Sequence, residues 1–220
     1  MPFELNALET RILGCLLEKE RLTPEVYPLS LNGLATACNQ STNRDPVTAY
    51  DEKTIEEGLT SLREKRLAVM VSGAGLRVSK YRHHLPEQCP LDAAQSALIC
   101  VLLLRGPQTA GELRLRTERM HPFPSLEAVE QTLNALAAED KGLVVLLPQR
   151  PGQKERRYRQ LLSSASVADE SSPESFASES GPTARPLVER VAALEAETAA
   201  LKAELQQLRE ELAGFRRQFE

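Results

Sequence analysis

Apolar residues recur at helical spacing in two separate parts of the chain. Leu5, Leu8, Ile12 and Leu16 lie three or four residues apart, and the run "ALICVLLL" at 97–104 has the same character. Each of these segments is followed by further helical periodicity and then by a short continuous apolar run that is typical of a β-strand. The pattern predicts two helix-rich units.

The order of these segments is the same in both units, which indicates an internal repeat. "LNALETRILGCLL" (5–17) resembles "LDAAQSALICVLL" (91–103), and "IEEGLTSLREKRLAVMV" (55–71) resembles "VEQTLNALAAEDKGLVVLL" (129–147). We therefore predict two copies of one domain, the first at 1–88 and the second at 89–162.

Each predicted copy contains three helices followed by a β-hairpin. Residues that commonly cap helices precede the second and third helices of both copies: Ser30, Asp51, Thr109 and Ser125. Three helices and a hairpin are the winged-helix arrangement. The predicted fold class is therefore mainly α (α+β), with two tandem winged-helix domains.

The composition changes after residue 162. Residues 163–186 are rich in serine, contain three prolines and carry a net charge of −3, which predicts a disordered linker. From 187 to 220, apolar residues recur at alternating spacings of four and three, as in a coiled-coil helix. The predicted seam consists of Leu187, Val191, Leu194, Leu201, Leu205, Leu208 and Leu212.

The charges beside this seam predict a homodimer through a parallel coiled coil. Each residue at a g position is opposite in sign to the e-position residue five places later, as Glu197 is to Lys202 and Glu204 is to Arg209. The alternative is a single amphipathic helix that folds back on the two domains, since heptad tracts this short serve either purpose.

Composition restricts the class of protein. The chain of 220 residues is 41% hydrophobic and 26% charged, which is typical of globular proteins. Its start lacks the features of a signal peptide, and its longest apolar run is much shorter than the roughly 20 residues of a membrane span. Four widely spaced cysteines suit a reducing compartment. We expect a cytoplasmic protein that does not bind membranes.

Three stretches of the chain resemble the YceH family of bacterial proteins: "TPEVYPLSLNGLATACNQSTNRDPV", "VSGAGLRVSKY" and "LLLRGPQTAGELRLRTERM". The resemblance covers residues 4–162, and a short C-terminal coiled coil is a shared feature. It implies a tandem winged-helix fold. It implies no catalytic residue, cofactor or substrate.

Basic residues are concentrated in the second copy. Residues 90–162 contain ten basic and eight acidic residues, whereas residues 1–89 have a net charge of −1. The predicted wing and second helix of this copy supply the candidate nucleic-acid-binding residues: Arg150, Lys154, Arg156, Arg157, Arg159, Arg114 and Arg116. Neutralised phosphates provide most of the affinity for DNA, so these residues favour double-stranded DNA as a partner. The alternative is a solvated hairpin with ordinary surface arginines.

The predicted third helices favour a different partner. Glu52, Glu56 and Glu57 in the first copy and Glu127 and Glu130 in the second would repel phosphate. The prediction is a non-enzymatic dimeric DNA-binding protein that resembles transcription regulators. The alternative is an adaptor that binds a protein partner through its tandem winged helices and coiled coil.

No motif in the chain predicts catalysis. There is no glycine-rich phosphate loop and no hydrolase or metalloprotease motif, and His83, His84 and Cys89 lack the second close pair of ligands that a metal site requires. We expect no enzyme activity, no metal and no cofactor.

The polar segment "ACNQSTNRDPVTAY" (37–50) is longer than its counterpart in the second copy. Twelve residues (39–50) precede the third helix, against seven (118–124) in the second copy. One interpretation is local caps and turns that clasp the structure. The other is a site at which Asn39, Gln40, Asn43 and Arg44 bind an anion, a nucleic-acid backbone or acidic residues of a partner.

Overall fold

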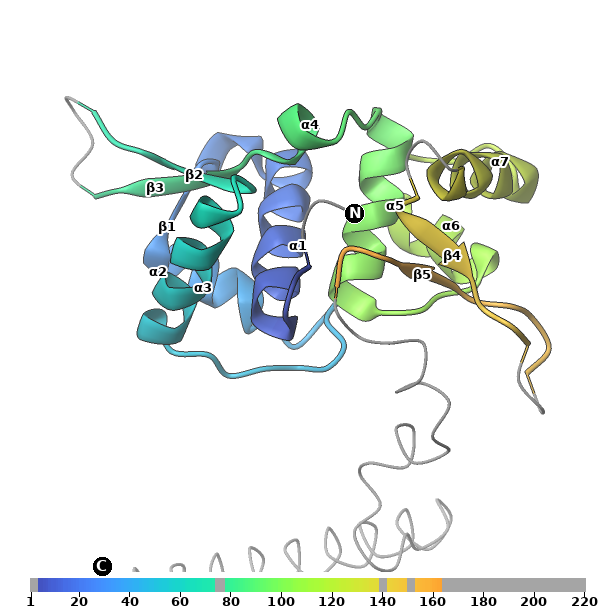
Figure 1. Ribbon diagram of the computed structural model, residues 1–220, viewed down its shortest axis with the longest axis horizontal. Coiled ribbons are helices and arrows are strands. Elements are labelled where there is room, and N and C mark those ends of the chain that lie inside the picture. The colour runs from blue at the N-terminus through green and yellow to red at the C-terminus, as the bar shows by residue number, and fades with distance from the viewer. Residues whose placement is uncertain (1–3, 74–77, 139–141, 150–152, 164–220) are drawn as a thin grey trace, which may run out of the picture. The chain divides into compact units, whose positions relative to one another are not determined.

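Two helices, α1 (Ala7–Leu22) and α5 (Ala93–Arg105), lie side by side in the computed structural model of the protein (Figure 1). The structure describes residues 4–73, 78–138, 142–149 and 153–163. These residues belong to one compact α+β unit, in which α1 begins the first repeat and α5 begins the second.

Both repeats contain the predicted order of three helices followed by two antiparallel strands. After α1, the first repeat continues with η1 (Pro24–Val26), β1 (Leu29–Ser30), α2 (Leu31–Cys38), α3 (Glu52–Glu64), β2 (Ala68–Val71) and β3 (Lys80–His83). The short helix α4 (Leu85–Gln88) leads into the second repeat. This repeat contains α5, α6 (Ala110–Thr117), α7 (Leu126–Ala137), β4 (Val144–Leu146) and β5 (Tyr158–Gln160).

The predicted helix caps are confirmed. In each case the capping side chain accepts a hydrogen bond from a backbone N–H in the first turn of its helix, which satisfies a donor that the helix leaves unpaired. The four caps are Ser30, Asp51, Thr109 and Ser125. The central helices also begin with reciprocal caps, Asn6 with Glu9 on α1 and Asp92 with Gln95 on α5.

The strands form two small antiparallel sheets. In the first repeat β3 lies between β2 and β1, and β1 is a strand that the sequence pattern did not predict. In the second repeat β4 pairs with β5, with Val145 opposite Arg159, and Tyr158 of β5 forms a further bridge with Gln108. Figure 1 shows the two hairpins pointing away from the central helices.

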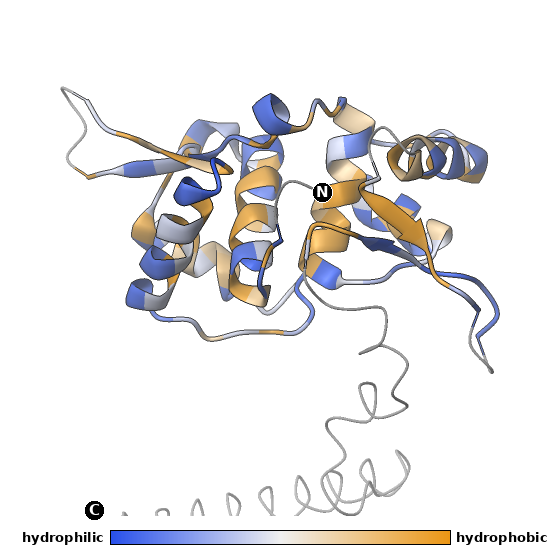
Figure 2. Ribbon diagram, in the orientation of Figure 1, coloured by the Kyte–Doolittle hydropathy of each residue, from blue (hydrophilic) through white to orange (hydrophobic). Residues whose placement is uncertain are grey.

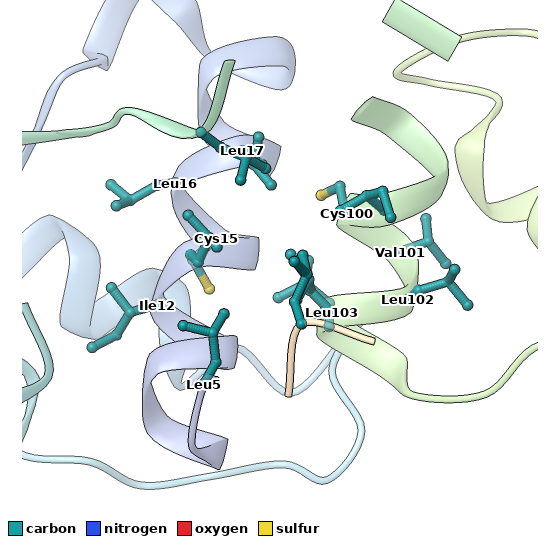
Figure 3. Packing of buried hydrophobic residues seen from close by; sticks show 14 of the residues in the cluster. Leu5, Ile12, Cys15, Leu16, Leu17, Cys100, Val101, Leu102 and Leu103 are labelled. Carbon is teal, nitrogen blue, oxygen red and sulfur yellow. The ribbon is translucent and has the colours of Figure 1, made fainter. Parts of the chain in front are cut away.

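The two repeats share one hydrophobic core. Cys100 and Leu103 of α5 point towards α1, whereas Val101 and Leu102 point to the other side of α5 (Figure 3). Gly14 allows the close approach of the helices, because a Cβ at this position would lie 2.8 Å from Leu104 Cδ2. Figure 2 shows hydrophobic residues along both α1 and α5, the two helices that form the centre of this core.

The ends of the unit are also joined. The Leu5 N–H donates a hydrogen bond of 2.7 Å to the Leu162 carbonyl, so the start of the first repeat pairs with the end of the second. Among the helices that the structure describes, none combines the length and the apolar character needed to cross a membrane.

Candidate functional site

The polar segment 39–50 forms a loop whose two ends are held together by one amide side chain. Asn39 Nδ2 donates to the Tyr50 carbonyl at 2.7 Å, and the Tyr50 N–H donates back to Asn39 Oδ1 at 2.8 Å. Because the loop leaves α2 and returns to α3 at this closed point, its length does not separate the two helices.

Arg44 points into the protein interior, with only 4% of the residue exposed. Its Nη2 lies 2.6 Å from Glu18 Oε2, its Nη1 lies 3.0 Å from Glu18 Oε1, and its Nε donates to the Ala37 carbonyl. Gln40 Oε1 accepts a further bond from Nη2 at 3.0 Å. Arg44 therefore fastens the loop to α1 and α2 and is not presented to a ligand.

The pairing keeps Glu18 ionised although it is buried. Burial raises the pKa of Glu18, but the hydrogen bonds and positive charge of Arg44 lower it more, with smaller contributions from Lys19 and Asn43. The resulting pKa lies below the ordinary value of a glutamate. The loop is thus closed by a fully charged ion pair.

A second arginine, Arg11, supports the loop from beneath. Its Nη1 donates to the Cys38 carbonyl at 3.1 Å, and its Nη2 donates to the Pro46 carbonyl. At the far end of the loop, the Asp45 N–H donates to the Leu104 carbonyl of α5 at 2.9 Å. Figure 1 shows the loop crossing from the first repeat to the end of α5.

Sequence reasoning missed Arg11 and Glu18. Both lie in the stretch 11–18 of α1, in which every residue is buried. Charged residues within a helical segment that is otherwise apolar on all sides require partners in the interior. The two charged residues in this apolar segment therefore indicated buried ionic contacts. The segment itself does not indicate which residues make those contacts.

A cleft of about 500 Å³ lies beside the loop, between the first repeat and α6 of the second. Lys19 and the loop residues 40–43 line one part of it, and Arg116, Arg119 and Met120 line another. The structure thus brings Gln40 and Asn43 of the predicted polar site together with Arg116 of the predicted nucleic-acid surface.

The cleft carries more positive than negative charge. Lys19, Arg116 and Arg119 line it, and the one carboxylate among its lining residues, Glu18, already pairs with Arg44. Partial burial, followed by the nearby charges of Arg105 and Arg157, lowers the pKa of Arg116, whereas Glu112 and Asp45 act in the other direction. An anion in the cleft would relieve this repulsion.

The predicted four-residue polar site is divided between two places. Gln40 and Asn43 line the cleft, where Gln40 Oε1 accepts from Lys19 Nζ at 3.3 Å and Asn43 Nδ2 donates to Glu18 at 2.8 Å. Asn39 and Arg44 are not among the lining residues, because their polar groups bind carbonyls, amides and a carboxylate of the fold.

The predicted nucleic-acid surface is smaller in the structure than in the sequence. Lys154 and Arg156 are exposed near β5, and Arg114 is exposed on α6 with Nη2 3.2 Å from the Pro124 carbonyl. Arg150 lies outside the described residues.

Two arginines of the predicted surface have other surroundings. Arg159 is only 5% exposed on β5, so the structure removes it from the surface on which the sequence placed it. Arg157 donates to Glu112 and to the Pro107 carbonyl, each at 2.9 Å, and so joins the hairpin to α6. The alternation of the short strand was too brief to distinguish its buried face from its exposed one.

The third helices present acidic faces. Glu52, Glu56 and Glu57 on α3 are exposed, as are Glu127 and Glu130 on α7. Of the predicted linker 163–186, only Ser163 is described, and it forms a bridge with Leu5. Residues 164–186 and the whole predicted seam, from Leu187 to Leu212, lie outside the described residues.

Known proteins resemble this chain over most or all of its length. The profile of a family described as "Protein of unknown function, DUF480" matches residues 5–153. A UPF0502 protein of Geobacter sulfurreducens is 50% identical over 222 residues, which cover 100% of both chains, and one of Geotalea daltonii is 52% identical over 221 residues with the same coverage. A UPF0502 protein of Opitutus terrae is 53% identical over 159 residues, covering 72% of this chain and 69% of its own.

Proposed function

Because the chain belongs to the DUF480 family of bacterial UPF0502 proteins, whose descriptions assign no activity, we propose its function from its own surface: a non-enzymatic, dimeric tandem winged-helix protein that binds double-stranded DNA. The order of helices and hairpins supports the winged-helix assignment. Fold alone is weak support for DNA binding, so the proposal depends on the charge of the second repeat.

The observation that carries the proposal is an excess of arginine where α6 meets the second hairpin. Glu112 is shared by Arg157, at 2.9 Å, and by Arg116, at 3.9 Å. Arg105 adds a third positive charge close enough to lower the pKa of Arg116, after the larger effect of partial burial. The two carboxylates that act on Arg116, Glu112 and Asp45, do not neutralise three guanidinium groups, and phosphates would supply the missing negative charge.

The exposed acids of α7 make this helix unsuitable for the major groove, because they would face phosphates and base acceptors. We therefore place the DNA contact on α6 and the second hairpin, where Arg114, Lys154 and Arg156 are exposed. A dimer formed by the C-terminal heptads would present two such surfaces to one duplex and increase the number of phosphate contacts.

Fluorescence anisotropy of a labelled duplex at low salt tests the proposal. The triple variant Arg114→Ala, Lys154→Ala, Arg156→Ala should lose most of the affinity. A control triple variant with the same change in charge, Arg21→Ala, Lys53→Ala, Arg63→Ala, removes exposed residues of the first repeat and should bind as the parent does. Absence of duplex binding by the parent protein at low salt would end the proposal.

The exposed acids of α3 and α7 favour a second candidate, an adaptor that binds a basic protein partner. Capture of partners on the immobilised full chain separates the two. Under the adaptor hypothesis, a bound protein should be lost after Glu56→Lys and Glu57→Lys, and duplex DNA should not be retained.

A further inference from the structure

The cleft between loop residues 40–43 and α6 combines hydrogen-bond donors and positive charge with apolar residues, and binding of duplex DNA does not require this combination. We propose that it binds a small phosphate monoester that carries an apolar group. This inference goes beyond the proposed DNA binding, because the ligand is a soluble molecule of low mass and the site is concave.

Several donors that line the cleft are available to such a ligand. The hydroxyls of Ser41 and Thr42 and the guanidinium of Arg119 make no hydrogen bond or ion pair with any other described residue. Arg116 Nη1 is buried and has no hydrogen-bond partner among the described residues, since its nearest carboxylate oxygen, on Glu112, is 3.9 Å away. A phosphate oxygen satisfies donors of each of these kinds.

The types of donor favour phosphate over other anions. Two arginines provide planar pairs of N–H groups that match phosphate oxygens, and two hydroxyls on adjacent residues supply further donors from the opposite wall. Lys19 contributes a third positive charge, and the carboxylate of Glu18, the one acid of the lining, is shared between Arg44 at 2.6 Å and Lys19 at 3.2 Å. A dianionic phosphate would balance the net charge of the lining residues.

The cleft also has three apolar lining residues. They are Leu22, Leu115 and Met120. Leu115 is 75% exposed, whereas Leu113, two residues earlier on the same helix, is fully buried. A ligand with an aromatic or aliphatic group would cover this leucine. The volume, about 500 Å³, is in the range of pockets that hold small organic molecules.

The loop wall of the cleft is fixed before any ligand arrives. Arg44 holds it through Glu18 and the Ala37 carbonyl, and Asn39 closes its ends. A preformed wall reduces the ordering cost of binding. This accounts for the insertion of the polar segment in one repeat only: it supplies Ser41 and Thr42 to a cleft that the second repeat completes.

Isothermal titration of the full chain with phenyl phosphate tests the inference, with inorganic phosphate as the comparison. Phenyl phosphate should bind saturably and more tightly than inorganic phosphate. Arg119→Gln should weaken binding by about tenfold or more, since it removes a charge-assisted hydrogen bond. Leu115→Ser should remove the advantage of phenyl phosphate over inorganic phosphate. Both residues are exposed, so the variants should fold.

Arg114→Gln is the matched control, because Arg114 is exposed on the same helix and does not line the cleft. Its affinity for phenyl phosphate should equal that of the parent. An equal loss in Arg114→Gln and Arg119→Gln would overturn the inference, as it would show a general effect of surface charge. Absence of saturable binding of phenyl phosphate at millimolar concentrations would also overturn it.

Competition with duplex DNA separates this site from the proposed DNA surface. If duplex DNA displaces phenyl phosphate and Arg119→Gln weakens the duplex as strongly as it weakens phenyl phosphate, the cleft receives a backbone phosphate and the small-ligand inference fails. Unchanged duplex affinity in Arg119→Gln supports the inference. Failure of DNA binding itself leaves the phenyl phosphate titration fully interpretable, because that titration contains no DNA.

Discussion

The guanidinium of Arg44 and the carboxylate of Glu18 form a two-point ion pair, with Nη2 2.6 Å from Oε2 and Nη1 3.0 Å from Oε1. The side chains are 0% and 3% exposed. Neither charge has access to bulk water, so Arg44 depends on Glu18 for compensation, and Glu18 depends mainly on Arg44, with a second contact to Lys19 at 3.2 Å. The polar loop and α1 are therefore joined by an interaction that is costly to break from one side only.

Arg44→Ala should lower the free energy of unfolding by about 3 kcal/mol, because it removes the main partner of the buried Glu18 carboxylate and leaves only Lys19, at 3.2 Å, to compensate it. Chemical denaturation of the full chain provides the measurement. Arg82→Ala is the control, since Arg82 and Glu87 form an exposed pair at 3.7 Å, and its loss should cost less than about 1 kcal/mol. Equal and small losses in the two variants would show that Arg44 is not a structural clasp.

Acidification should destabilise the protein through Glu18. Its pKa in the folded state lies below the unfolded value of about 4.3, so its contribution to stability is present above that value and is lost as the pH falls through the folded pKa. The same holds for Glu9, whose pKa is raised by burial but lowered more by Lys65 and Ser61.

Denaturation midpoints measured from neutral pH to about pH 3 check this dependence. The double variant Glu18→Met, Arg44→Met removes the ion pair without leaving an isolated charge, and its stability should fall less on acidification than that of the parent. Identical pH profiles of parent and variant would contradict the assignment. The contribution of Glu9 should remain in both.

The local parts of the fold were predictable from sequence because short-range interactions determine them. Ser30, Asp51, Thr109 and Ser125 each cap the helix that directly follows them. The helical spacing of apolar residues and the repeat likewise predicted the order of the main elements. β1 was missed because a strand of two residues has no periodicity of its own, and it depends on pairing with β3.

The candidate site was predictable only in part because it depends on distant residues. Arg44 and Glu18 are 26 positions apart, and no spacing rule indicates that they meet. Arg116 and Ser41 come from different repeats and share a cleft only because α1 and α5 pack together. Arg159 resembles its exposed neighbour Arg156 in sequence, and only the pairing of β5 shows that it is buried.

The close packing of α1 and α5 depends on Gly14. A Cβ there would lie 2.8 Å from Leu104 Cδ2 and 3.1 Å from Leu103 Cβ. Gly14→Ala should therefore destabilise the protein by about 1–3 kcal/mol through overpacking, reduced by roughly 0.5–1 kcal/mol of improved helix propensity. Thermal denaturation is the measurement.

Gly111→Ala makes the same change on α6 in open space, where a Cβ would approach only Thr109 Oγ1 at 3.9 Å. This control variant should be as stable as the parent or slightly more stable. If Gly14→Ala is also neutral, the two helices have room to separate and the shared core is less tightly packed than the structure indicates.

The salt dependence of duplex binding should distinguish exposed from buried arginines of the second repeat. Removal of one phosphate contact by Arg156→Ala should reduce the slope of log affinity against log salt by about 1. Arg159→Met should leave the slope unchanged and lower the melting temperature, because Arg159 is buried. A reduced slope in Arg159→Met would show that β5 exposes this residue when DNA binds.

The heptads after residue 186 should make the full chain a dimer. Sedimentation equilibrium should give twice the chain mass for the full protein and the monomer mass for residues 1–165, the compact unit without the heptads. Equal monomer masses would favour a single helix that folds back on the two repeats.

Charge reversal tests the parallel register of this dimer. One variant changes the g positions by Glu197→Lys, Glu204→Lys and Glu211→Lys, and the other changes the e positions by Lys202→Glu, Arg209→Glu and Arg216→Glu. Each variant alone should dissociate more readily, because like charges then face each other across the seam. Mixing the two variants should restore a dimer containing one chain of each, since every g position then faces an e position of opposite charge.

Because exposed pairs contribute only about 0.2–1 kcal/mol each, the effect should appear in the choice of partner more than in the stability of the parent dimer. Two variants that dimerise as well alone as together would contradict the parallel arrangement.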